Sequence, residues 1–340
     1  MSPLEIPGTE MERDPLAAPP RALPASVMGA GELLDLALFD SAHQTARLCE
    51  ARKSEANSPY LSNWFARRQA MLMVEWEQMK TDELRLLLHM DTDSMEIFSR
   101  SERTAGDYVH AMRQALHLDM ERVTPAQIID LLAQAQKSDR RLHDDARQWS
   151  LEQDVVKLAE ELAALDPKRQ PTPYTAAAIL RNLLDETRFN GHGPLLAYLL
   201  APAIVQAAFA APRALVGIAS IPKLELLRHA RVGDFDLVFL RAVAEDAKRT
   251  ADAQFRFAQV RAKILSMIQV ERNTSMAPKA IDHFLSVPIM SVPMLAEQMD
   301  LTRKGSQLVI ERLVRSGVLQ VHNHENAKGR LYVCSQALGI

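Results

Sequence analysis

Several polar side chains near the C-terminus have the chemistry to bind nucleic acid, and five of them lie between Thr302 and Gln307. Arginine can donate two parallel hydrogen bonds to guanine, and glutamine can pair with adenine in the same way. Threonine, serine and lysine more often bind phosphate oxygens. Further arginines follow along the same segment, and two basic residues flank a polar loop beyond it. The predicted DNA-binding residues are Thr302, Arg303, Lys304, Ser306, Gln307, Arg312, Arg315, Lys328 and Arg330.

The segments around these residues have the pattern of a winged helix-turn-helix, which we expect between residues 278 and 333. Ser291 is placed to cap one helix and Thr302 to cap the next, with a short turn between them. The second of these helices, predicted from Arg303 to Ser316, begins with the candidate contacts. In a helix-turn-helix, this helix lies in the major groove with its N-terminal residues at the base edges. Its expected apolar inner side consists of Leu308, Val309, Leu313 and Val314.

The wing is predicted from the residues that follow this helix. Gly317 suits the left-handed position that ends a helix. Two strand candidates, Val318 to Val321 and Arg330 to Val333, enclose the polar loop from His322 to Gly329. The segment before the first capped helix, Pro288 to Ser291, is expected only to break the preceding helix.

The charge of the C-terminal region leaves two interpretations open. From residue 278 to 340, seven Lys and Arg residues stand against five Asp and Glu, a balance of +2. The basic residues gather on the predicted recognition helix and wing, which favours DNA binding. A helix-turn-helix also occurs as a dimerisation or protein-contact module, so a protein-interaction role without DNA is the alternative.

The composition predicts a mainly α fold class, a multi-helix N-terminal domain followed by the C-terminal winged helix-turn-helix. Alanine, leucine, glutamate and arginine dominate, and only 12 of 340 residues are glycine. A formal net charge of −3 gives no overall attraction to nucleic acid, so DNA must be bound by a local patch. Cys49 and Cys334 are far apart in sequence, which argues against a disulfide framework or a zinc finger.

The chain divides into three predicted parts. Residues 1–28 carry six prolines and few apolar residues, and we expect a disordered arm. Residues 29–272 form an all-helical domain with a hinge near 166–173, where three prolines interrupt the helical pattern. Residues 273–340 form the DNA-binding domain. The long helical pattern before residue 272 suggests a connecting helix and a dimer contact, so we expect a homodimer.

The N-terminus lacks the basic start and apolar core of a secretory signal, which predicts a cytoplasmic protein. The most apolar run, Leu195 to Ala211, is interrupted by Pro202 and Gln206, so we expect a buried core helix and no membrane contact. No phosphate-binding glycine loop is present. His322 and His324 lack further ligands nearby. We therefore predict no catalytic residues, no cofactor and no metal.

Three segments carry a resemblance to a known group of proteins: Leu36 to Ala42, Ser58-Pro59 ahead of Trp64 and Arg67, and Pro288 to Ala296. From about residue 31 onward, the sequence resembles uncharacterised proteins of rhizobia and their relatives. These join an all-helical domain of unknown function to a C-terminal helix-turn-helix DNA-binding domain. The resemblance implies DNA binding, as in a transcriptional regulator, and implies no reaction.

A second resemblance rests on Phe189 to Leu196, which is similar to the loop of Fic-domain proteins. In that family the loop reads HPFx[D/E]GNGR; its histidine is the general base, and its arginine and glycine-rich backbone hold phosphate. Here Glu186 occupies the histidine position and Pro194 the arginine position. The resemblance implies a shared helical fold without the chemistry, and a diverged Fic-like nucleotidyl transferase is the enzymatic alternative.

Overall fold

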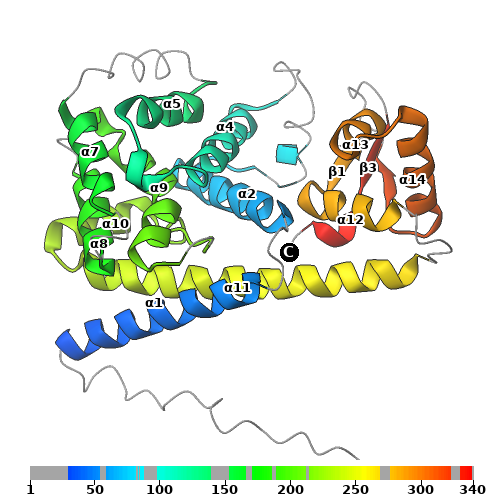
Figure 1. Ribbon diagram of the computed structural model, residues 1–340. Helices are drawn as coiled ribbons and strands as arrows, with labels where there is room; N and C mark the ends of the chain where they lie inside the picture. The colour runs from blue at the N-terminus through cyan, green and yellow to red at the C-terminus, as the bar shows by residue number, and fades with distance from the viewer. Residues whose placement is uncertain are drawn as a thin grey trace, which may run out of the picture.

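The computed structural model describes residues 30–53, 59–81, 83, 85–87, 98–138, 153–165, 171–185, 189–211, 214–268, 276–322 and 330–338. Within these ranges the protein is mainly helical and contains one small antiparallel sheet (Figure 1). The predicted mainly α fold class is therefore confirmed. The predicted N-terminal arm lies outside the described residues.

The helical part of the chain is built around α9, whose residues are almost all buried. Local signals start several of its helices: Ser99, Thr124 and Thr172 each form a capping box with the residue three positions later. Thr172 thus caps α8 at the end of the segment predicted as a hinge, and residues 166–170 of that segment lie outside the described ranges. The helices are α1 (Ala30–Lys53), α2 (Pro59–Trp76), α4 (Arg100–Ala115), α5 (Pro125–Ala135), α7 (Gln153–Ala163), α8 (Pro173–Leu183), α9 (Gly193–Ala208), α10 (Lys223–Val232) and α11 (Phe235–Met267).

Helix α11 is the longest element, with 33 residues and a length of about 50 Å at a rise of about 1.5 Å per residue. Helix α1 lies along its N-terminal half, and the C-terminal elements lie beside its other end (Figure 1). The buried face of α1 is formed at helical spacing by Ala37, Ser41, Thr45 and Leu48. A single helix thus contacts both the helical part and the C-terminal part.

The C-terminal elements are α12 (Ala277–Ser286), β1 (Ile289–Ser291), α13 (Val292–Met299), α14 (Arg303–Arg315), β2 (Gln320–His322) and β3 (Leu331–Val333). The strand order is β1-β3-β2, and both pairings are antiparallel. Tyr332 on the central strand lies opposite Met290 on one side and Val321 on the other. The segment expected only to break a helix therefore also contributes an edge strand.

Polar contacts attach α12 to the helical part. Arg67 of α2 donates a hydrogen bond to the carbonyl oxygen of Ser286 at 2.8 Å, and Asn63 bonds the Ser286 hydroxyl. From the other side, Arg261 of α11 binds both carboxylate oxygens of Asp282, at 2.6 and 3.2 Å. These bonds fix the orientation of α12. The predicted domain boundary at residue 272 falls within 269–275, outside the described residues.

Candidate nucleic-acid interface

The turn between α13 and α14 positions the candidate contact residues. Asp300 adopts a left-handed conformation with φ 53° and ψ 48°, which ends α13 and reverses the chain. Thr302 then caps α14, because its hydroxyl oxygen accepts a hydrogen bond from the Gly305 amide at 3.1 Å. The sequence from Asp300 to Gly305 thus starts α14 at Arg303, as predicted.

Four of the predicted contacts lie together on the surface at the start of α14. Thr302, Arg303, Lys304 and Gln307 are all exposed. The Gln307 amide donates a hydrogen bond to Glu311 one turn later, at 2.9 Å, so it is held on the helix surface. The positive end of the α14 helix dipole lies at the same place and favours anions. The arrangement can present a cation, a hydroxyl and an amide to a nucleic acid.

The prediction for Ser306 was wrong. Its side chain is fully buried, and its hydroxyl has no hydrogen-bond partner. Ser306 shares the inner face of α14 with Ile310 and Leu313, at the spacing of one helix side. It therefore cannot reach a ligand on the outer face.

The prediction for Leu308 was also wrong, because this residue is exposed where a buried position was expected. It was expected on the inner side of α14, but 58% of it is exposed, next to Gln307. The apolar residues of α14 follow more than one stripe, so the sequence alone does not show which stripe packs inward. The exposed leucine adds an apolar group to the outer face.

The remaining predicted contacts are more widely spread. Arg315 is exposed near the C-terminal end of α14, where its Nε donates to the carbonyl oxygen of Glu311 at 3.4 Å. Arg312 is half-buried on the same helix, and Arg330 is exposed immediately before β3. Lys328 lies outside the described residues. The compact part of the candidate interface is therefore the first turn of α14.

The loop that resembles the Fic motif has a packing role. Its first residues form a short 3₁₀ helix, Phe189–Gly191, directly before α9. A Cβ on Gly193 would lie 1.8 Å from the carbonyl oxygen of Leu183, so only glycine permits this close approach. His192 shares a hydrogen bond of 2.7 Å with Gln136. Pro194 is buried at the start of α9, and Glu186 lies outside the described residues.

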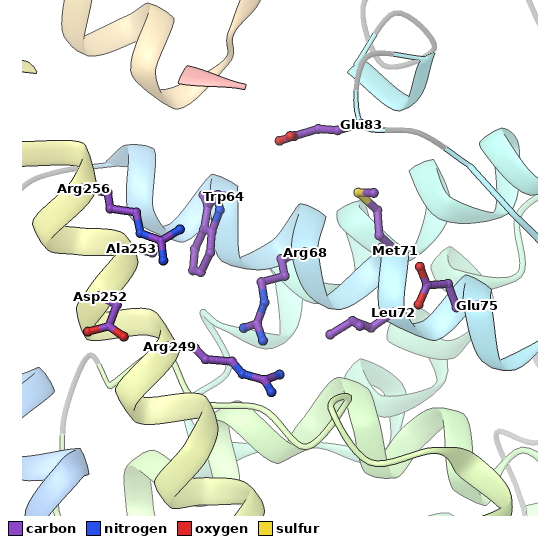
Figure 2. Close-up of a pocket in the computed structure, with 10 residues that line it drawn as sticks. All are labelled: Trp64, Arg68, Met71, Leu72, Glu75, Glu83, Arg249, Asp252, Ala253 and Arg256. Atoms are coloured by element: carbon purple, nitrogen blue, oxygen red, sulfur yellow. The ribbon is translucent and has the colours of Figure 1, made fainter. Parts of the chain in front are cut away.

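A cleft of about 460 Å³ opens between α2 and α11 (Figure 2). Arg68 and Arg249 extend into it from opposite helices, and the Arg68 guanidinium lies 5.5 Å from the centre of the Trp64 ring. Three arginines and three carboxylates line the cleft, so the formal charges of its lining side chains cancel. The lining residues are Trp64, Arg68, Met71, Leu72, Glu75, Glu83, Arg249, Asp252, Ala253 and Arg256.

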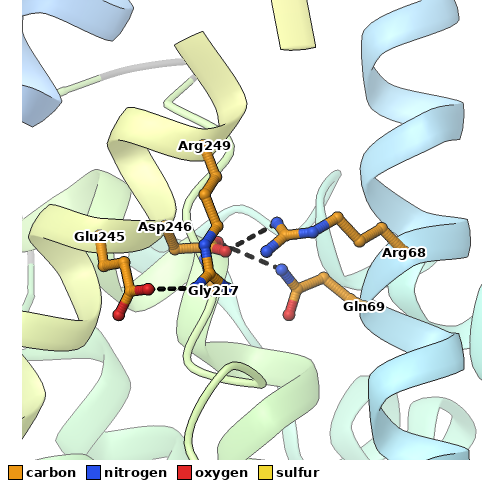
Figure 3. Close-up of polar contacts among 6 residues, drawn as sticks. All are labelled: Arg68, Gln69, Gly217, Glu245, Asp246 and Arg249. Atoms are coloured by element: carbon orange, nitrogen blue, oxygen red, sulfur yellow. Dashed lines mark hydrogen bonds and ion pairs between the residues drawn. The ribbon is translucent and has the colours of Figure 1, made fainter. Parts of the chain in front are cut away.

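Beneath this cleft, the fully buried carboxylate of Asp246 joins three parts of the chain (Figure 3). It accepts hydrogen bonds from Arg68 at 2.8 Å, Gln69 at 3.2 Å and the Gly217 amide at 2.6 Å. Burial raises the pKa of Asp246, whereas the charge of Arg68 and the bond from Gly217 oppose that rise.

This network was not anticipated, because Asp246 is 177 positions from Gln69 and no local sequence signal links them. A Cβ on Gly217 would lie 2.5 Å from the Gln69 side chain, so the connection also needs glycine there. The network joins α2, α11 and the segment between α9 and α10. Its position in the core indicates a structural role.

Among the residues that the structure describes, no three or more His, Cys, Asp or Glu side chains gather as a metal site would require. Within the same ranges, every helix is too short or too polar to cross a bilayer. No known protein-family model matches the chain, and no curated protein is significantly similar to it in sequence. The resemblances to the rhizobial proteins and to Fic-domain proteins therefore stay predictions.

Proposed function

We propose that the C-terminal elements form a winged helix-turn-helix and that the protein binds duplex DNA with it, as a transcriptional regulator. The order α12, β1, α13, α14, β2, β3 supports this proposal, because a tight turn joins α13 and α14, and the two strands that follow complete a three-stranded sheet with β1. In such a unit, α14 is the helix that enters the major groove.

The observation that carries the proposal is the open first turn of α14. Arg303, Lys304 and Gln307 are exposed there, and Thr302 precedes them at the cap. Arg303 would bind guanine, and Gln307 would bind adenine after releasing Glu311. Lys304 and Thr302 would bind phosphate oxygens.

The charge of α14 fits a phosphate-rich partner. The helix carries Arg303, Lys304, Arg312 and Arg315 against a single acidic residue, Glu311. The whole chain has a net charge of −3, so the positive surface is local. Binding through such a patch releases counterions and weakens as salt concentration rises.

A homodimer would supply the affinity that one small unit lacks, because two copies can bind two half-sites one helical turn apart. Exposed apolar side chains on α1 and α11 offer a surface for this contact. They are Leu36 at 43% exposure, Phe39 at 65% and Phe255 at 64%.

Recovery of bound fragments from randomised duplex DNA, followed by fluorescence anisotropy, tests the proposal. We expect enrichment of a defined sequence by the wild type and loss of that enrichment in the double variant R303A/K304A. The matched control is R241A/K248A, which removes two exposed cations from α11. If the wild type enriches no sequence, or if the α14 variant still enriches the same one, α14 is not the recognition helix.

A further inference from the structure

Helix α14 carries a large apolar side chain, Leu308, on its outer face, where 58% of the residue is exposed. The buried residues of this helix, Ser306, Ile310 and Leu313, are spaced by four and three positions, so they form one inner stripe. Leu308 lies two positions after Ser306 and two before Ile310. Because each residue of an α-helix is rotated by about 100° from the one before it, Leu308 projects away from the core.

The outer face around Leu308 is polar and mainly cationic. Lys304 lies one turn before it and Arg315 two turns after it, at the spacing of one helix side, and both are exposed. Glu311, the single acidic residue of α14, lies between Leu308 and Arg315 and accepts a hydrogen bond from Gln307 at 2.9 Å. Leu308 is thus an isolated apolar group on the outer face of this helix.

The isolation of Leu308 favours one kind of partner over another. The centre of a protein–protein interface is depleted of charged residues, so a protein partner needs a contiguous apolar patch. One turn away from Leu308 on either side, however, are Lys304 and Glu311. Duplex DNA surrounds its base edges with phosphates, which matches an apolar side chain between two cations. In the major groove, the apolar group of the base edges is the C5-methyl group of thymine.

We propose that Leu308 contacts the C5-methyl group of a thymine in the major groove, which makes a thymine part of the recognised sequence. The inference rests on the proposed function and specifies part of its DNA substrate. Helix α14 lies at the edge of the molecule (Figure 1), with its inner stripe turned towards the protein. When this helix enters the groove, the middle of its outer face meets the base edges, and Lys304 and Arg315 are left to the phosphates.

A thymine contact adds a selectivity that the polar residues of α14 do not supply. Arg303 and Gln307 can select guanine and adenine through hydrogen bonds. Leu308 makes no side-chain hydrogen bond, and its contact is favourable because it removes apolar surface from water. Burying one methyl-sized group is worth about a fourfold change in affinity.

Replacing thymine by uracil tests the contact, because it removes the methyl group and leaves every hydrogen-bonding atom of the base in place. Selection from randomised duplex DNA first gives the sequence that the wild type recognises. Anisotropy titrations then measure the Kd of duplexes in which one thymine at a time is replaced. We expect the wild type to lose about fourfold in affinity at a specific thymine. Leu308→Ala should bind the two duplexes equally, whereas Leu308→Met, which keeps a long apolar side chain, should retain the preference.

The matched control is Leu224→Ala on α10, which removes another exposed leucine, at 81% exposure, and should keep the wild-type response to uracil. Neither Leu308→Ala nor Leu224→Ala should lower the Tm appreciably, because both side chains are exposed.

The outcomes separate this inference from the proposed function. If the wild type enriches no sequence, DNA recognition itself is rejected, and the thymine contact with it. An enriched sequence that lacks thymine, or that the wild type binds equally well with uracil at every position, rejects only the contact. The contact is also rejected if Leu308→Ala keeps the full loss on uracil substitution, the result expected if Leu308 binds a protein partner instead.

Discussion

Two helices of this protein, α2 and α14, each carry two adjacent cationic side chains. Those on α2 are largely buried, whereas those on α14 are exposed. On α2, Arg67 is buried and Arg68 nearly so, with 1% and 19% of their side chains exposed. Both bind carboxylates, Glu83 and Asp246. On α14, Arg303 and Lys304 are exposed to solvent.

The difference follows from the position of each helix. Helix α2 packs against α4, α11 and α12, so its polar side chains must find partners inside the protein. Helix α14 packs on α12 and α13 and leaves its other side open. An exposed cation needs no internal partner, because water solvates it, and it remains available to an external anion. The same residue type thus joins segments of the fold on α2 and stays exposed to solvent on α14.

The largest expected effect comes from breaking a buried pair. Asp246→Ala would remove the acceptor of Arg68, Gln69 and the Gly217 amide and leave them without their partner. Loss of one member of a buried ion pair typically costs about 3–5 kcal/mol. We expect a loss of that size in the free energy of unfolding, measured by chemical denaturation.

The matched control is Asp252→Ala, an exposed carboxylate on the same helix. Its effect should stay within about 0.5 kcal/mol, as for most surface substitutions. Equal destabilisation by the two variants would show that burial is not what makes the Asp246 pair important.

The second effect concerns the exposed cations. R303A/K304A should leave the free energy of unfolding unchanged within about 0.5 kcal/mol, because these side chains are solvated. Because the proposal assigns a phosphate to Lys304 and a guanine to Arg303, the slope of log affinity for DNA against log salt concentration should become shallower by about 1. Anisotropy titrations at several salt concentrations measure that slope. A marked loss of stability with an unchanged slope would give Arg303 and Lys304 the structural role seen on α2.

The third effect separates the two faces of α14. Ser306→Ala removes a buried hydroxyl that has no hydrogen-bond partner, so the variant should gain up to about 1 kcal/mol of stability. Thr302→Ala removes the helix cap and should lose about 1 kcal/mol. Thermal unfolding of the two variants measures whether each one gains or loses stability. A destabilised Ser306→Ala would indicate that the hydroxyl has a partner, such as a buried water molecule.

Local chemistry explains what the sequence could predict. The caps at Ser291 and Thr302 were recognisable because a capping side chain bonds the backbone amide three positions later. The inner face of α14 could not be predicted with the same accuracy. Leu308 and Leu313 are equally apolar, and only the packing of neighbouring helices decides that one is exposed and the other buried.

Contacts between distant segments were beyond prediction for a different reason. Arg67 and Arg68 are adjacent in sequence but bind groups 16 and 178 positions away. The short strand β1 was likewise missed, because its three residues become a strand only by pairing with β3. Such features depend on the completed fold.

The smallest expected effect is a pH dependence of the free energy of unfolding. It tests whether burial also shifts the pKa of a weakly basic group, the imidazole of His283. Burial lowers the pKa of His283 on α12, and the charge of Lys279 adds to this, so the folded protein holds the neutral imidazole more strongly than the unfolded chain does. The unfolded chain therefore binds more protons once the pH falls towards the ordinary histidine pKa of about 6.5. By linkage, this histidine makes the folded state less stable as the pH falls through that region, and its effect disappears above it. His283→Gln should flatten this part of the stability profile, measured by denaturation between pH 5 and 8. An unchanged profile in His283→Gln would mean that solvent reaches the ring as freely as it reaches Arg303.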